Sequence, residues 1–132
     1  MKITLDEIKR IGEGKIISYR GAEALAAVKQ NGYALQYVKD QTQEICLAAV
    51  KQNGHALPYV KDQTTEICFA AVKQNGYALQ YVKDQTTEIC FAAVKQNGDA
   101  LKYVKESVFE QDKFTIELTR DQIEQVRKQF NI

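Results

Sequence analysis

EICFAAVKQNGYALQYVKDQTT, residues Glu66–Thr87, occurs four times in this chain in slightly different forms. The other copies precede or follow it directly, with no inserted residue, at Ala22–Gln43, Glu44–Thr65 and Glu88–Lys105. A fixed period of 22 residues indicates a repeat protein, in which each unit buries its apolar side against its neighbours.

The overall composition restricts the classes of function. The chain has 132 residues and a formal net charge of +1, so bulk charge does not attract it to nucleic acid or anionic membranes. Its apolar runs are far shorter than the roughly 20 residues that span a bilayer. The N-terminus lacks the apolar core of a secretory signal. We therefore expect one folded unit in the cytoplasm.

The first half of each copy predicts an α-helix. In the third copy this helix is expected over about residues 65–74, because Thr64 is a typical N-cap residue and apolar residues recur at helical spacing. Asn75 and Gly76 follow, and glycine accepts the left-handed conformation that often ends a helix. The apolar residues cover more than half of the helix circumference, which favours an inner, closely packed helix.

The second half predicts another short helix, over about Tyr77–Asp84, with Ala78, Leu79 and Val82 toward the core. Two helices per copy predict an all-α fold, a right-handed α-solenoid of four 22-residue helix-turn-helix repeats over residues 22–109.

Both ends of the chain depart from the repeat and are expected to cap it. Residues 1–21 form the N-terminal cap, with a short helix over about residues 5–11. Residues 110–132 form the C-terminal cap, where residues 113–118 alternate like a strand and a helix follows over 120–130, opened by Thr119 and Gln122. Residues 113–118 echo residues 2–6. Two interpretations stay open, a strand pair between the ends or a helix capped by Thr4.

The repeats also resemble a known family. The sequence LAAVKQNGYALQYVKDQTQEIC, residues Leu25–Cys46, is similar to short tandem helical repeats found mostly in bacterial proteins and described as a domain of unknown function. The resemblance covers Ala22–Lys105 and depends on the motifs AAVKQNG, AL-YVK and QT-EIC. It implies a helical array and carries no activity, cofactor or site residue.

No catalytic, cofactor-binding or metal-binding residues are predicted. No copy places a nucleophile beside a base, and the glycines do not form a phosphate-binding loop. Stacked helices lie about 9–10 Å apart, too far for a disulfide between neighbouring copies, so Cys46, Cys68 and Cys90 are expected to be buried thiols. The chain is predicted not to be an enzyme.

A binding surface is the stronger hypothesis, because two rows on the second helix vary between copies and a constant tyrosine row lies beside them. Aromatic residues at a surface edge are favoured in protein interfaces. The candidate partner-binding residues are Tyr33, His55, Tyr77 and Asp99 in one row, Gln36, Pro58, Gln80 and Lys102 in another, and Tyr37, Tyr59, Tyr81 and Tyr103 in the constant row.

The predicted function is therefore a protein–protein interaction module, either an adaptor or a small inhibitor-type binder. Two alternatives remain open. One is a structural or self-assembling protein that pairs through its end caps. The other is RNA or single-stranded DNA binding, with tyrosines stacking on bases and the lysine rows on phosphate.

Overall fold

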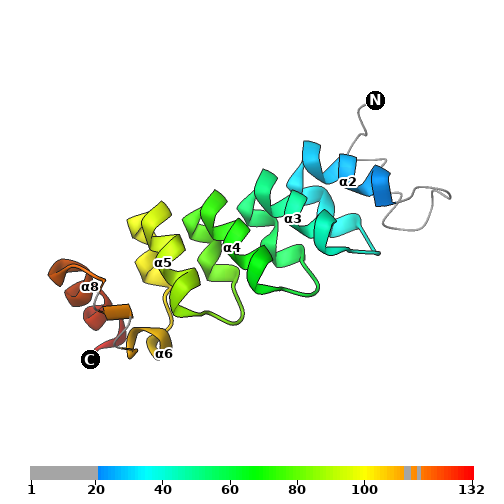
Figure 1. Cartoon of the computed structure of the whole chain (residues 1–132). Helices are drawn as coiled ribbons and strands as arrows, with labels where there is room; N and C mark the ends of the chain where they lie inside the picture. Colours follow the sequence, from blue (N-terminus) through cyan, green and yellow to red (C-terminus); the bar gives the residue numbers. More distant parts are fainter. Residues whose placement is uncertain (1–20, 112–113, 116) are drawn as a thin grey trace.

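The computed structural model describes residues 21–111, 114–115 and 117–132. Each copy of the repeat folds into an α-helix followed by a shorter 3₁₀ helix, and these pairs lie side by side in a row (Figure 1). The elements are α2 (Gly21–Gln30), η1 (Gly32–Tyr37), α3 (Gln43–Gln52), η2 (Gly54–Tyr59), α4 (Thr65–Gln74), η3 (Gly76–Tyr81), α5 (Thr87–Gln96) and η4 (Gly98–Tyr103). The predicted all-α solenoid is confirmed.

The α-helices begin and end where the repeat pattern predicts. Helix α4 runs from Thr65 to Gln74, and the Thr64 side chain accepts a hydrogen bond from the backbone N–H of Ile67. The same cap recurs at Thr42 and Thr86 in the neighbouring copies. Burial matches the predicted inner helix, since Ala71 and Val72 have no exposed surface. Their removal from water is the main stabilising contribution of this wall.

The second half of each copy is a 3₁₀ helix and is shorter than predicted. Element η3 ends at Tyr81, and Val82 is already extended, with φ −75° and ψ 118°. Its backbone N–H closes a bond to the Leu79 carbonyl, which limits the segment to tight i→i+3 turns. The predicted inward residues are correct, because Ala78, Leu79 and Val82 are buried.

The predicted left-handed glycine at the helix end is wrong. Helix α4 ends at Gln74, and Asn75 follows in an extended conformation. The Asn75 side chain caps η3 by accepting from the Tyr77 N–H. Gly76 instead allows close approach of the next copy. A Cβ atom at this position would lie 2.5 Å from the carbonyl oxygen of Ala93 in α5. The Gly76 N–H donates to the Gln96 side chain at 2.6 Å.

Glutamines in the connecting loops join successive 3₁₀ helices. The Gln63 side chain donates to the Tyr81 carbonyl at 2.9 Å and accepts from the Lys83 N–H at 3.1 Å. Gln41 and Gln85 make the same two contacts one repeat earlier and later. One side-chain amide thus bonds a carbonyl and an N–H of the next repeat. These backbone groups lie at an irregular loop and have no partner within a regular helix.

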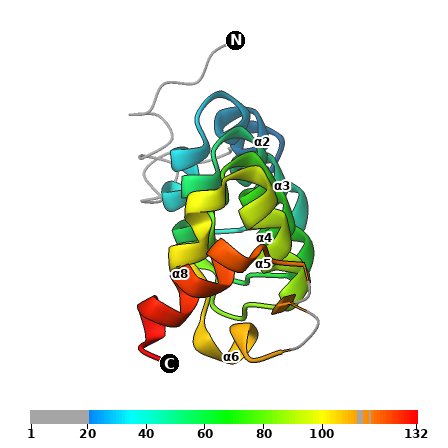
Figure 2. The ribbon, with the colours of Figure 1, turned by 90° about the vertical axis from the view of Figure 1, so that its left-hand side faces the viewer.

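The C-terminal segment packs on the last repeat and includes α6 (Glu106–Phe109) and α8 (Arg120–Phe130). Viewed from this end, α8 crosses in front of the stack (Figure 2). Phe114 is fully buried and lies 4.9 Å from Phe91 between ring centroids. The predicted helix over 120–130 is confirmed, including its capping box at Thr119.

The strand predicted over residues 113–118 is not present in its described part. Phe114 and Thr115 are helical, and residues 117–118 form a turn and a bend. The backbone there makes turn-type hydrogen bonds, such as that from the Phe114 N–H to the Gln111 carbonyl. In this conformation the Phe114 ring packs against Phe91 of α5. The N-terminal cap, with its predicted helix and strand, lies outside the described residues apart from Gly21.

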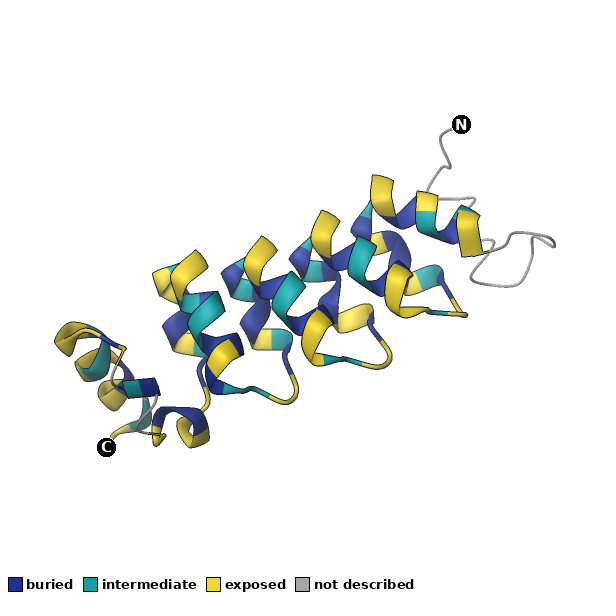
Figure 3. Ribbon diagram, viewed as in Figure 1, coloured by how far each residue is buried: buried dark blue, intermediate teal, exposed yellow. Residues whose placement is uncertain are grey.

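Burial divides each repeat into an inner and an outer side. Buried residues line the interior between the row of α-helices and the row of 3₁₀ helices, and exposed residues face outward on both rows (Figure 3). The molecule therefore presents two long surfaces, one formed by the α-helices and one formed by the 3₁₀ helices.

Candidate partner-binding surface

The twelve residues predicted to bind a partner all lie on the 3₁₀ helices η1–η4. We call them together the aromatic face. Gln36, Pro58, Gln80 and Lys102 are all exposed, as predicted for the outer row. Tyr33 and Tyr59 are the most open aromatic side chains of the described chain, with 39% and 37% of their surface exposed. Tyr37, Tyr77, Tyr81 and Tyr103 are half-buried.

Aromatic side chains on this face pair across the repeat boundaries. Tyr33 contacts Tyr59 edge to face, with ring centroids 6.2 Å apart, and Tyr77 contacts Tyr103 in the same way at 6.1 Å. Each pair joins a residue of the variable row to the constant tyrosine of the next repeat. Each edge-to-face contact favours this arrangement of the two rings by about 0.5–1.5 kcal/mol, so the side chains of the face form a ladder of pairs that joins the repeats.

His55 forms the middle rung of this ladder. Its ring centroid lies 5.8 Å from that of Tyr81. Nδ1 is 3.4 Å from the Tyr81 hydroxyl, and Nε2 is 3.1 Å from the Asn75 side-chain nitrogen. His55 is half-buried and contacts two side chains of the next repeat.

The last rung differs from the others because charged residues surround it. The Tyr77 hydroxyl donates to the Asp99 carboxylate at 3.0 Å. The Lys102 ammonium lies 5.3 Å from the Tyr77 ring centroid and 5.1 Å from that of Tyr103. Both distances are within the range of a cation–π contact. Variation along the two rows thus changes the aromatic face from neutral in the first repeat to charged in the last.

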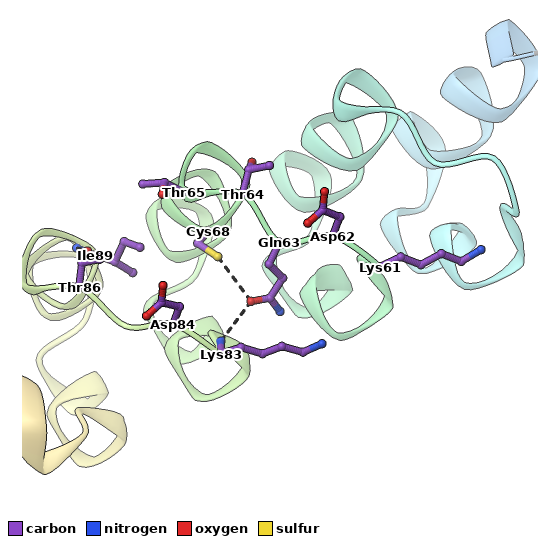
Figure 4. A pocket seen from close by; sticks show the side chains of 10 residues that line it. All are labelled: Lys61, Asp62, Gln63, Thr64, Thr65, Cys68, Lys83, Asp84, Thr86 and Ile89. Carbon is purple, nitrogen blue, oxygen red and sulfur yellow. Dashed lines mark hydrogen bonds between the residues drawn. The ribbon is translucent and has the colours of Figure 1, made fainter.

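Apart from the aromatic face, hollows lie between successive connecting loops. One of about 260 Å³ is lined by residues of two successive loops and by Cys68 (Figure 4). The Cys68 thiol donates to the Gln63 side-chain oxygen at 3.6 Å. Burial is the main cause that raises the pKa of this thiol, and the Asp84 carboxylate raises it further. A protonated, hydrogen-bonded thiol is a poor nucleophile, so Cys68 does not make this hollow a reactive site.

The other two cysteines make the same hydrogen bond. Cys46 and Cys90 are buried free thiols that donate to Gln41 and Gln85. Burial raises the pKa of Cys90 to about 12, and the positive charge of Lys105 opposes this rise. Within the described part of the chain, no group of three or more His, Cys, Asp or Glu side chains is placed to hold a metal ion.

Sequence reasoning did not identify an apolar hollow on the opposite side of the molecule. It has a volume of about 460 Å³ and lies between α2 and α3, with Leu25, Leu47 and Ala48 in its wall. Later copies carry Phe69 and Phe91 at the position of Leu47. The change from leucine to phenylalanine between copies is the sequence signal that the two ends of the α-helical surface differ.

Comparison with known proteins gave one type of match. A family model described as a domain of unknown function (DUF4116) matches residues 24–64, 43–86 and 64–109, in overlapping segments that follow the repeats. Searches of curated proteins and of solved structures found no match. Among the residues that the structure describes, no helix is long and apolar enough to cross a membrane.

Proposed function

Because this chain belongs to the DUF4116 family, whose description assigns no function, we propose its function from geometry alone. We propose a non-enzymatic, cytoplasmic protein–protein interaction module that binds its partner with the aromatic face. The single observation that supports this best is the row of three aromatic pairs that crosses all the repeat boundaries. Tyrosine is enriched among the residues that contribute most to protein interfaces.

The physical case depends on the pairing and on the position of the rings. The two rings of each pair contact each other, so less side-chain entropy is lost when a partner binds than for separate side chains. The tyrosines are exposed or half-buried, and Tyr37, Tyr81 and Tyr103 pack against the core. This combination of apolar area and hydrogen-bonding capacity suits recognition. The partner is another protein, and this chain acts on it as an adaptor or as a small inhibitor-type binder.

Capture of partners from a lysate of the source cell tests this proposal. Wild-type protein is compared with Tyr33→Ala/Tyr77→Ala, which removes two rungs of the ladder, and with Lys51→Ala/Lys95→Ala on the exposed side of α3 and α5. We expect the tyrosine variant to lose the partners and the lysine variant to keep them. Retention of the same partners by a folded tyrosine variant would show that the chosen surface is wrong.

Two other functions are separated from this one by simple measurements. Nucleic-acid binding requires affinity that falls steeply with salt, because lysine–phosphate contacts release counterions. Binding that does not change between about 50 and 200 mM salt excludes it. Self-assembly through the end caps requires association of the protein alone, so light scattering that shows a monomer at high concentration excludes that function.

A further inference from the structure

The aromatic face contains two tyrosine–tyrosine pairs that have the same geometry and different neighbours. In the pair Tyr77–Tyr103, the ammonium of Lys102 lies over both rings, 5.3 and 5.1 Å from their centroids. The corresponding position in the pair Tyr33–Tyr59, two 22-residue periods earlier, is occupied by Pro58. Proline has neither a charge nor the length to cover the rings, and no other cation of the described residues 21–111, 114–115 and 117–132 is placed over this pair.

Exposure of the rings agrees with this difference. Tyr33 and Tyr59 are both exposed, at 39% and 37%, whereas Tyr77 and Tyr103 are half-buried. The distance between ring centroids is nearly the same, 6.2 Å in the first pair and 6.1 Å in the last. The first pair is therefore a preformed copy of a site that the last pair already fills with its own lysine.

Resting on the proposed function, we infer that the Tyr33–Tyr59 pair binds a lysine or arginine side chain of the protein partner. The electron-rich faces of tyrosine rings attract cations, and Lys102 shows where a cation lies on such a pair in this molecule. The middle rung is a weaker candidate, because one of its rings is His55, and the Gln80 at the corresponding position bonds back to the Tyr77 carbonyl.

Nearby positive charge does not prevent this binding. Lys61 follows Tyr59 by two residues, just as Lys105 follows Tyr103, and each donates its ammonium to a backbone carbonyl of the preceding repeat. The last pair accepts Lys102 although Lys105 lies beside it in this way. The neighbours of the two pairs differ, because the carboxylate of Asp99 corresponds to the ring of His55 and because Gln129 of α8 donates to the Lys102 carbonyl. A partner cation at the first pair thus gains from the rings alone.

The first test needs no ligand. Pro58→Lys supplies the missing cation from the chain itself, and Lys102→Gln removes the one at the last pair. NMR spectra of the tyrosine rings are recorded for each variant. In Pro58→Lys we expect contacts between the new ammonium chain and the rings of Tyr33 and Tyr59, matching those of Lys102 with Tyr77 and Tyr103 in the wild type. A lysine that stays in solvent at this position would overturn the inference.

The second test uses N-acetyl-arginine amide as the probe and N-acetyl-citrulline amide as its uncharged counterpart of the same shape. At constant ionic strength, the arginine probe is expected to shift the resonances of Tyr33 and Tyr59 more than those of Tyr77 and Tyr103. The citrulline probe is expected to bind about two- to fivefold more weakly. Pro58→Lys should abolish the difference between the two pairs. Equal shifts at all tyrosines, or equal binding of both probes, would overturn the inference.

These outcomes are separable from failure of the proposed function. If the arginine probe does not select Tyr33 and Tyr59 while the Tyr33→Ala/Tyr77→Ala variant still loses its partners, the aromatic face binds proteins without a cation site. If the probe does select this pair while lysate partners are unaffected by the tyrosine substitutions, the cation site exists and the proposed function is wrong.

Discussion

Gly76 and Gly98 occupy the same position in successive repeats, and each follows the residues AAVKQN. Gly76 is buried, and a Cβ atom there would lie 2.5 Å from a carbonyl oxygen of the next repeat. Gly98 is exposed, and a Cβ atom there would meet nothing within 4 Å. Identical sequence therefore does not mean identical constraint. A residue in this array is constrained by the repeat that follows it, and the last repeat has only the C-terminal segment.

The C-terminal segment replaces a fifth repeat in some contacts and not in others. Phe114 packs on Phe91 of α5, and the Thr87 hydroxyl donates to the Gln111 side chain at 2.6 Å. Near η4, the Gln129 side chain donates to the Lys102 carbonyl. These contacts cover α5 and part of η4, but they leave Gly98 open. The following predictions test this difference between interior repeats and the chain end, from the largest expected effect to the smallest.

Removal of the Phe114 ring tests whether the C-terminal segment covers the array as a repeat does. The side chain is fully buried, so Phe114→Ala should lower the free energy of unfolding by about 3–5 kcal/mol. Urea unfolding followed by circular dichroism measures this. Ile132→Ala, at a residue with 56% of its surface exposed, is the control and should change stability by less than about 0.5 kcal/mol. Equal small effects would mean that the segment does not cap α5.

The glycine comparison itself is tested by Gly76→Ala and Gly98→Ala. At Gly76 the new methyl group meets the Ala93 carbonyl and displaces the Gln96 side chain, which accepts from the Gly76 N–H, so we expect a loss of about 3 kcal/mol. At Gly98 the methyl group meets open space, and the effect should be neutral or slightly stabilising, by up to about 1 kcal/mol, because alanine reduces the entropy of the unfolded chain. Similar losses at both positions would refute the role of the following repeat.

Two glutamines allow a comparison between hydrogen bonds that join two repeats and a hydrogen bond within one repeat. Gln63→Leu leaves the Tyr81 carbonyl and the Lys83 N–H without their partner, which should cost about 2 kcal/mol. Gln36→Leu removes only an exposed bond to the Tyr33 carbonyl of the same 3₁₀ helix and should cost less than about 0.5 kcal/mol. Thermal unfolding of both variants under the same conditions measures the difference.

The smallest predicted effect concerns alkaline pH. The pKa of Cys90 is raised from 9.0 to about 12 in the folded protein, so above about pH 9 the thiol ionises only in the unfolded chain. Its contribution to stability is full below this pH and declines as pH rises toward 12. The stability difference between wild type and Cys90→Ala should therefore narrow by about 1 kcal/mol between about pH 8 and 10. A constant difference would show that the thiol ionises equally in both states.

The sequence alone predicted the period, the α-helix boundaries and the inward residues, because these depend on local signals. The Thr64 cap and the apolar spacing act within one repeat and were interpreted correctly. The 3₁₀ geometry of η3 and the role of Gly76 were not predicted, since both depend on contacts with the next repeat. The repeat sequence contains both residues of each contact between repeats, but the pattern does not show that they meet.

The candidate site follows the same division. The rows of Tyr33 and Tyr59 were expected at the surface from helical spacing, and both side chains are exposed. Their pairing was not expected, because it joins positions 26 residues apart in sequence, on two different repeats. The contacts of His55 with Tyr81 and Asn75 also join two successive repeats, across 26 and 20 residues of sequence. Sequence patterns located the surface, and only the stacked fold showed which side chains touch.

The contacts between repeats have a consequence for the length of the molecule. Every interior boundary uses the same glycine, the same glutamines and the same close approach of α-helices. Another copy of residues 66–87 placed in the middle of the chain would find a matching partner on both sides. Such an insertion would move the Tyr33–Tyr59 pair one step farther from Lys102 and the C-terminal segment without changing either. The number of copies thus acts as a molecular ruler that sets the spacing between two features at opposite ends of the same surface.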